Sequence, residues 1–152
     1  MPETVAVVIP TFNSSVTIER ALESVVGQTC LPTEVIVIDN ASADDTVARV
    51  RTFASKYPRI TWVIEVSPTN IGPGAARNRG WNLAKSDLIA FLDSDDSWHP
   101  EKLRLQGEIV RMFPESVLFA IGTSFSAQMK WPHEMWTNVV PRSLTDSSST
   151  TF

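Results

Sequence analysis

The chain alternates between two hydrophobic patterns, short apolar runs and longer stretches with helical spacing. The apolar runs are rich in β-branched residues and predict strands at residues 4–9, 34–38, 60–66, 88–92 and 117–121. Apolar residues then recur every three or four positions after each of the first four runs, which predicts four helices. Their apolar faces hold Ile18, Leu22, Val25 and Val26; Val47, Val50, Phe53 and Ala54; Ala76, Gly80, Leu83 and Ala84; and Leu103, Ile109, Val110, Met112 and Phe113. This alternation predicts an α/β fold with a mostly parallel sheet and helices on both faces.

Proline positions and a loss of periodicity limit the predicted elements. Pro10 is expected to end the first strand, because proline donates no hydrogen bond to a sheet. Beyond Gly122 the periodic pattern fades, and Val140-Pro141 is typical of irregular backbone. We therefore expect an α/β domain over residues 1–122 and an irregular segment over residues 123–152.

Composition and charge narrow the class of protein. The 152 residues suit a single domain, and 43% of them are apolar, as in globular proteins. The net charge is −4 and no basic stripe is present, which argues against a nucleic-acid partner. Cys30 is the only cysteine, so no intrachain disulfide forms, which is compatible with a reducing compartment. No apolar run approaches the roughly 20 residues of a membrane span, and we expect a cytoplasmic protein, or one at the cytoplasmic face of the membrane.

Three acidic residues directly follow the apolar run at 88–92. Asp93, Asp95 and Asp96 therefore lie at the carboxyl end of a predicted strand, where open α/β sheets bind ligands. Clustered carboxylates stay ionised together when a cation or several donors neutralise them, and Mg²⁺ or Mn²⁺ with substrate phosphates is the simplest solution. Because side chains alternate at a strand end, Asp93 and Asp95 can point the same way, and Asp96 is free to cap the next helix. The alternative is a solvated acidic turn.

Two other strand ends carry candidate ligand contacts. Phe12, after the first strand, could stack on a planar base, but its position alone favours a core aromatic that caps the strand end, because aromatic residues mostly bury for packing. Asp39 and Asn40 end the second strand, where a carboxylate can accept from a base N–H or a ribose hydroxyl. The alternative for Asp39 is an Asx-type turn or a helix cap.

A glycine-rich turn opens the third predicted helix. Gly72-Pro73-Gly74-Ala75-Ala76-Arg77 resembles a dinucleotide fingerprint only loosely, because arginine replaces the third glycine and the turn follows the third strand. A tight turn into a helix N-terminus, with Arg77 and Arg79 in its first turns, favours an anionic ligand. A structural turn with solvated arginines is the alternative.

Five segments of the chain carry a combined signal. They are Val7-Val8-Ile9-Pro10-Thr11-Phe12-Asn13, Ser24-Val25-Val26-Gly27-Gln28-Thr29, Glu34-Val35-Ile36-Val37-Ile38-Asp39-Asn40-Ala41-Ser42, Asn70-Ile71-Gly72-Pro73-Gly74-Ala75-Ala76-Arg77-Asn78-Arg79-Gly80 and Phe91-Leu92-Asp93-Ser94-Asp95-Asp96-Ser97-Trp98. Together they resemble the nucleotide-sugar half of family-2 inverting glycosyltransferases, in the order and at the approximate spacing found there. The resemblance runs from about Thr4 to Phe113 and implies a GT-A fold, the Rossmann-like fold of nucleotide-diphospho-sugar transferases.

The resemblance also implies a ligand and site residues. The donor is a nucleotide-diphosphate sugar, often UDP-linked, and Asp39 is expected to contact the base. Asp93 and Asp95 form a DxD-type element, and a Mg²⁺ or Mn²⁺ ion is held by Asp93, Asp95 and, less centrally, Asp96. The residues expected to bind the nucleotide sugar are Pro10, Thr11, Phe12, Asp39, Asn40, Gly74, Arg77, Asp93 and Ser94.

Inverting transfer also needs a carboxylate that takes the acceptor proton, and this base remains unassigned. In the family it lies downstream, in an acceptor-binding half, whereas Glu134 and Asp146 are the only acids after Glu115 and neither stands in a recognisable base motif. We expect a donor-binding part whose acceptor half is truncated or lost, acting on a saccharide or lipid-linked saccharide of a cell-envelope polysaccharide. The alternative is a non-catalytic module that binds nucleotide sugars. An aspartyl phosphotransferase is disfavoured because no phosphate clamp follows the acids.

Overall fold

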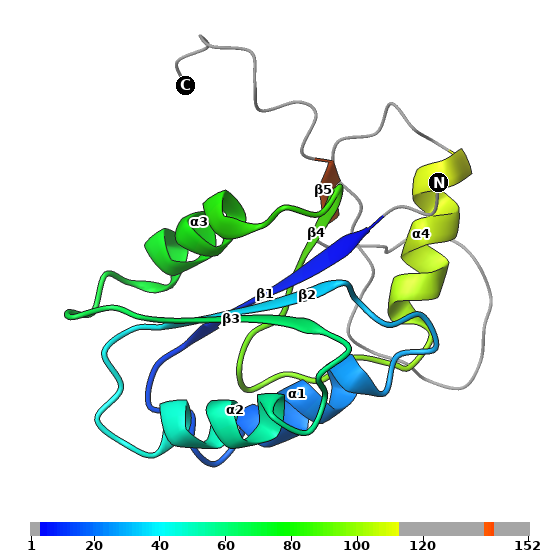
Figure 1. The fold of residues 1–152 in the computed structure, drawn as a ribbon. Helices are drawn as coiled ribbons and strands as arrows, with labels where there is room; N and C mark the ends of the chain where they lie inside the picture. Colours follow the sequence, from blue (N-terminus) through cyan, green and yellow to red (C-terminus); the bar gives the residue numbers. More distant parts are fainter. Residues whose placement is uncertain (1–3, 113–138, 142–152) are drawn as a thin grey trace, which may run out of the picture.

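The computed structural model describes residues 4–112 and 139–141. Its strands form one five-stranded sheet (Figure 1). The strands lie in the order β3-β2-β1-β4-β5. β1, β2, β3 and β4 are parallel, and β5 pairs with β4 in the antiparallel direction. The strands are β1 (Val5–Thr11), β2 (Glu34–Asp39), β3 (Thr61–Val66), β4 (Leu88–Phe91) and β5 (Val139–Pro141).

Helices cover both faces of this sheet, as the sequence predicts. Figure 1 shows α3 on one face, and α1 and α2 on the opposite face. The helices are α1 (Ile18–Val26), α2 (Thr46–Ala54), α3 (Pro73–Leu83) and α4 (Lys102–Met112). Within residues 4–112 and 139–141, no helix is long and apolar enough to cross a membrane.

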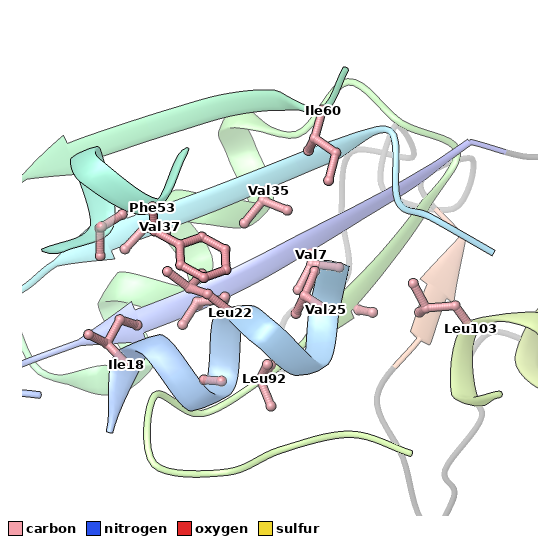
Figure 2. Packing of buried hydrophobic residues seen from close by; sticks show 14 of the residues in the cluster. Val7, Ile18, Leu22, Val25, Val35, Val37, Phe53, Ile60, Leu92 and Leu103 are labelled. Carbon is pink, nitrogen blue, oxygen red and sulfur yellow. The ribbon is translucent and has the colours of Figure 1, made fainter. Parts of the chain in front are cut away.

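The core beneath α1 and α2 follows the two-residue period of the strands. Val7 of β1 and Val35 of β2 point to this face and are fully buried (Figure 2). Leu22 and Val25 of α1 pack against them at helical spacing. Leu103 of α4 belongs to the same cluster, so α4 completes this layer. Burial of these aliphatic side chains fixes the sheet against its helices, at about 1.5–3 kcal/mol for each fully buried side chain.

The opposite face allows α3 to approach the sheet closely. Ala76 and Ala84 are buried there against Ile36 and Ile89. A Cβ at Gly80 would lie 2.3 Å from Cγ1 of Val8 in β1, so no larger residue fits without displacing the helix. The small-residue face of α3 therefore sets its distance from β1, and with it the position of the helix N-terminus.

Three sequence predictions about strands and helices need correction. Pro10 lies inside β1 and does not end it, because β4 pairs with β1 only as far as Val8 and Pro10 lies beyond that point. Val140 and Pro141 lie in β5 and not in irregular backbone. On α2 it is Thr46 that is buried, while Val47 is only partly buried.

Other predictions fall on residues that the structure does not describe. The strand expected at residues 117–121 lies outside the described residues, as do Phe113, Glu134 and Asp146. The domain boundary at residues 122–123 also falls there and stays a prediction.

The order of the strands creates a point where the chain changes direction in the sheet. From β1 the chain adds β2 and β3 on one side, and then crosses to place β4 on the other side of β1. The chain therefore leaves β1 toward β2 on one side, while β4 lies on the other side of β1. In open α/β sheets a crevice forms outside the carboxyl ends of the strands at such a point.

Candidate functional site

A cleft of about 630 Å³ lies at this position. Its volume is within the range of ligand sites for small molecules. Segments that follow each of the four parallel strands meet in it. The lining residues are Pro10, Thr11, Phe12, Asn13, Ser14, Thr17, Asn40, Asn70, Pro73, Arg77, Asp93, Ser94 and Asp95.

The loop after β1 supplies one wall and an aromatic side chain. Phe12 is 49% exposed and lines the cleft. It is therefore not the core aromatic that its position alone favours, and its ring is available to a ligand. Asn13 follows with a φ of 48°, in the left-handed region that asparagine tolerates better than most residues.

Asp39 and Asn40 end β2 side by side but have different surroundings. Asp39 is fully buried and does not line the cleft. Its Oδ1 accepts from the Thr11 hydroxyl at 3.1 Å, and its Oδ2 accepts from the Ser42 backbone N–H at 2.9 Å. The carboxylate thus holds the turn after β2, by a contact three residues on and not the two of an Asx-type turn. Asn40 does line the cleft, and its Oδ1 accepts from the Ile71 N–H at 3.0 Å, which ties β2 to the loop before α3.

The N-terminus of α3 points one arginine at the cleft and one away. Gly72 adopts a φ of 83° and Pro73 opens the helix, as the glycine-rich turn predicts. Arg77 lines the cleft and pairs with the Asp93 carboxylate. Arg79 instead pairs with Glu65 of β3 and does not line the cleft, so its predicted place at an anion site is wrong. Gly74 does not line the cleft either.

The acidic run after β4 divides as the strand alternation predicts. Asp93 and Asp95 line the cleft, and Asp96 does not. The Asp96 N–H donates to the Asp93 carbonyl at 3.0 Å, which closes a turn. Asp96 was expected to cap the next helix. It does not, because α4 begins only at Lys102.

The donor set suits a hard divalent cation that shares its shell with a ligand. The residues at 4–112 and 139–141 contain no group of three or more acids, histidines or cysteines that could hold a metal ion by themselves. Two aspartates in a cleft fit Mg²⁺ or Mn²⁺, which typically take one or two carboxylates and complete their shell with phosphates and water.

Several residues that line the cleft were not predicted from the sequence. Asn13, Ser14, Thr17, Asn70 and Pro73 line the cleft although none was predicted to bind a ligand. They are small polar or turn residues next to strand ends, and that position is the signal that could have identified them. His99 Nδ1 accepts from the Glu101 N–H at 3.3 Å just before α4, and His99 does not line the cleft.

An open, mostly parallel α/β sheet with a polar cleft at its switch point defines a ligand-binding protein of the Rossmann-like class. The family profile named glycosyl transferase family 2 matches residues 6–148. The chain therefore belongs to glycosyl transferase family 2, a family of enzymes.

Two curated relatives illustrate this membership. The chain is 43% identical over 100 residues to the succinoglycan biosynthesis protein ExoO of Rhizobium meliloti (strain 1021), which covers 66% of the chain and 28% of the relative. It is 35% identical over 144 residues to TuaG of Bacillus subtilis (strain 168), a putative teichuronic acid biosynthesis glycosyltransferase, which covers 93% of the chain and 54% of the relative. The chain thus spans about a quarter to a half of the length of these relatives.

Solved structures confirm the GT-A fold predicted by the resemblance. The S. aureus TarS 1–349 structure in complex with UDP aligns with a TM-score of 0.72 at 26% identity, over 85% of this chain and 38% of that one. The mannosyltransferase PcManGT from Pyrobaculum calidifontis, in complex with GDP-Man and Mn²⁺, aligns with a TM-score of 0.69 at 26% identity, over 80% and 35%.

Proposed function

We propose that this chain is the donor-binding part of a glycosyltransferase that moves a sugar, with inversion, from a nucleotide-diphosphate sugar to a saccharide or lipid-linked saccharide. The observation that carries the proposal is the cleft at the carboxyl ends of the strands, where Phe12, Asn40, Arg77, Asp93 and Asp95 meet. Structural neighbours in complex with UDP and with GDP-Man and Mn²⁺ support a nucleotide sugar as the ligand.

Each wall of the cleft offers a contact to one part of such a donor. The half-exposed ring of Phe12 is placed to stack on the base, and Asn40 offers an amide beside it. Asp39 is fully buried, so a direct contact from its carboxylate to a base N–H would require the groups that cover it to move. Arg77, on the first turns of α3, is placed to pair with the diphosphate.

We propose UDP as the nucleotide and Asp93 and Asp95 as the residues that hold a Mg²⁺ or Mn²⁺ ion beside it. A bound divalent cation neutralises charge on the departing diphosphate. Asp93 is paired with Arg77 in the cleft, and this pairing compensates the charge of a half-exposed carboxylate. With a cation at Asp93 and Asp95, Arg77 would be free to pair with the phosphates.

Transfer itself requires one more group than the described cleft supplies. The acceptor hydroxyl forms a bond to the anomeric carbon while the bond to the diphosphate breaks, and a base takes the hydroxyl proton. In the described residues, the carboxylates that line the cleft are Asp93 and Asp95, both assigned here to the metal. This observation favours, as a second candidate, a module that binds nucleotide sugars without transferring them. Glu134 and Asp146 remain the candidate bases.

Calorimetric titration with UDP, GDP and TDP, with and without Mn²⁺, tests the binding proposal. We expect Mn²⁺-dependent binding of UDP that is lost in Asp93→Ala and Asp95→Ala. The neighbouring variant Asp96→Ala is the matched control, because Asp96 lies outside the cleft, and a loss of binding in it alone would reassign the metal. Absence of binding by all three nucleotides to a folded sample would refute the proposal.

A second assay separates the enzyme from the binding module. The same sample is incubated with UDP-linked sugars and Mn²⁺, and the release of UDP is measured with and without candidate acceptors. Release that depends on Asp95 supports the transferase, whereas tight binding with no release supports the module.

A further inference from the structure

The cleft-lining loop at residues 12–15 is held by hydrogen bonds to the segment at residues 42–46, between β2 and the start of α2. We call this set of hydrogen bonds the clamp. Three successive backbone N–H groups, those of Asn13, Ser14 and Ser15, donate to side chains of that second loop. The distances are 2.8 Å to Ser42 Oγ, 2.8 Å to Thr46 Oγ1 and 3.0 Å to Asp44 Oδ2. A fourth hydrogen bond runs the other way, because the Asn13 side chain Oδ1 accepts from the Ala43 N–H at 2.9 Å.

Two of these contacts are hydroxyl relays that end on carboxylates. Ser42 Oγ donates to Asp39 Oδ1 at 2.6 Å, and Thr46 Oγ1 donates to Asp44 Oδ1. A hydroxyl has one proton, and an ionised carboxylate only accepts. Each hydroxyl must therefore donate its hydrogen bond to the carboxylate and accept from the backbone N–H of Asn13 or Ser14 with a lone pair. The direction of both relays is thus fixed by the two aspartates.

The electrostatics of Asp44 agree with this arrangement. The hydrogen bond from the Thr46 hydroxyl, with further bonds from backbone N–H groups of Thr46 and Ser15, holds the pKa of Asp44 well below its ordinary value. Asp44 therefore stays ionised through the neutral range and keeps its acceptor role. Neither Asp44 nor Thr46 lines the cleft, so both act through the loop and not on a ligand.

We propose that Asp44 and Thr46 are positioning residues that pre-organise the cleft-lining loop at residues 12–15, so that Phe12 and Ser14 are held in place before a nucleotide binds. Ser14 passes the constraint on, because its hydroxyl lies 2.7 Å from Ser94 Oγ in the loop after β4. A loop that is already ordered loses less conformational freedom on binding, which strengthens affinity without a new contact. This inference rests on the proposed function for its effect on affinity, but not for the clamp itself.

Four variants of the full chain test the clamp. Thr46→Val keeps the shape of the buried side chain and removes the relay, and Thr46→Ser keeps the hydroxyl. Asp44→Asn leaves one acceptor oxygen where two accept from Thr46 and Ser15. Asp45→Asn makes the same charge change at a neighbour whose side chain caps no helix N–H. Two quantities are measured for each: the affinity for UDP with Mn²⁺, and amide hydrogen exchange at Ser14 and Ser15 by NMR without nucleotide.

The clamp predicts that Thr46→Val and Asp44→Asn weaken UDP binding by roughly tenfold and speed exchange at Ser14 or Ser15. Thr46→Ser should restore both, and Asp45→Asn should change neither. Wild-type affinity in Thr46→Val, failure of Thr46→Ser to rescue, or an equal loss in Asp45→Asn would overturn the inference. If Thr46→Val does not fold, the exposed Asp44 carries the test. If the wild-type chain binds no nucleotide, the proposed function fails, and the exchange measurement still decides the clamp.

Discussion

Replacing Gly80 with alanine should push α3 away from the sheet. The new Cβ would lie 2.3 Å from Val8 Cγ1, 3.2 Å from Cγ2 and 3.3 Å from Cβ. Carbon atoms pack favourably at about 3.5–4.0 Å, so relief of the worst contact needs a shift of more than about 1 Å. Val8 is fully buried and β-branched, and its side chain has little freedom to turn away.

The size of the effect follows from two opposing contributions. Overpacking a core typically costs about 1–3 kcal/mol, and sometimes more. Alanine regains about 1 kcal/mol of helix propensity over glycine. Because the worst contact is only 2.3 Å, we take the upper end of the overpacking cost and expect a net loss of about 2 kcal/mol in the free energy of unfolding. This loss lowers the melting temperature by about 4–8 °C in a chain of this length. Because Pro73 and Arg77 lie on the same helix, affinity for nucleotide should fall as well.

A double-mutant cycle measured by urea unfolding checks this reasoning. Val8→Ala removes both Cγ atoms, and alone it should cost about 2–3 kcal/mol in lost burial and cavity formation. Combined with Gly80→Ala, it removes the clash, so the double variant should be more stable than the sum of the single losses by at least about 1 kcal/mol. Gly74→Ala is the control, since nothing in the described residues lies within 4 Å of its added Cβ. A neutral Gly80→Ala variant, or strict additivity with Val8→Ala, would refute the account.

Three further predictions test other parts of the molecule. Arg77→Gln should weaken UDP binding in calorimetry while Arg79→Gln leaves it unchanged, because only Arg77 lines the cleft; equal losses would contradict this assignment. Phe12→Ala should weaken binding by about tenfold or more if the ring stacks on the base, with an unchanged melting temperature since the ring is 49% exposed; an unchanged affinity would remove the stacking role. Burial lowers the pKa of Lys102 from 10.5 to about 8, so the folded protein bears a cost for the charged lysine below pH 8 that fades as the pH rises toward 10.5. Lys102→Met should therefore raise stability at pH 7, by at most about 3 kcal/mol, and by less at pH 10, and a gain that does not shrink with pH would contradict the burial effect.

Local pattern was enough to predict the parallel part of the sheet, and non-local pairing explains the misses. The fully buried strand β2 follows from its continuous apolar run. The prediction that Pro10 ends the first strand failed because the rule against proline assumes strand partners on both sides. Pro10 pairs with Ile38 of β2, whereas β4 ends opposite Val8. β5 is only three residues long and is defined by pairing with β4, so no periodic pattern predicts it.

The candidate site divides in the same way. Arg77 and Asp93 were predicted from their positions at a helix start and after a strand, whereas the position of Phe12 alone favoured a core aromatic and the family resemblance assigned it to the site. The fold brings all three to one cleft. Arg79 could have been excluded, because residues two apart on a helix face different sides. The burial of Asp39 depends on Thr11 and Ser42, contacts that only the folded loops create.

The position of the metal–nucleotide site is tested most directly by NMR of the ¹⁵N-labelled full chain with UDP and either Mg²⁺ or paramagnetic Mn²⁺. With Mg²⁺, we expect amide shifts at Phe12, Asn40 and Asn70, around the cleft. Exchange of Mg²⁺ for Mn²⁺ should broaden the amides of Asp93 to Asp95 most strongly. Broadening centred on the acids of α4, such as Glu108, or spectra unchanged by UDP, would contradict the assignment of this cleft as the donor site.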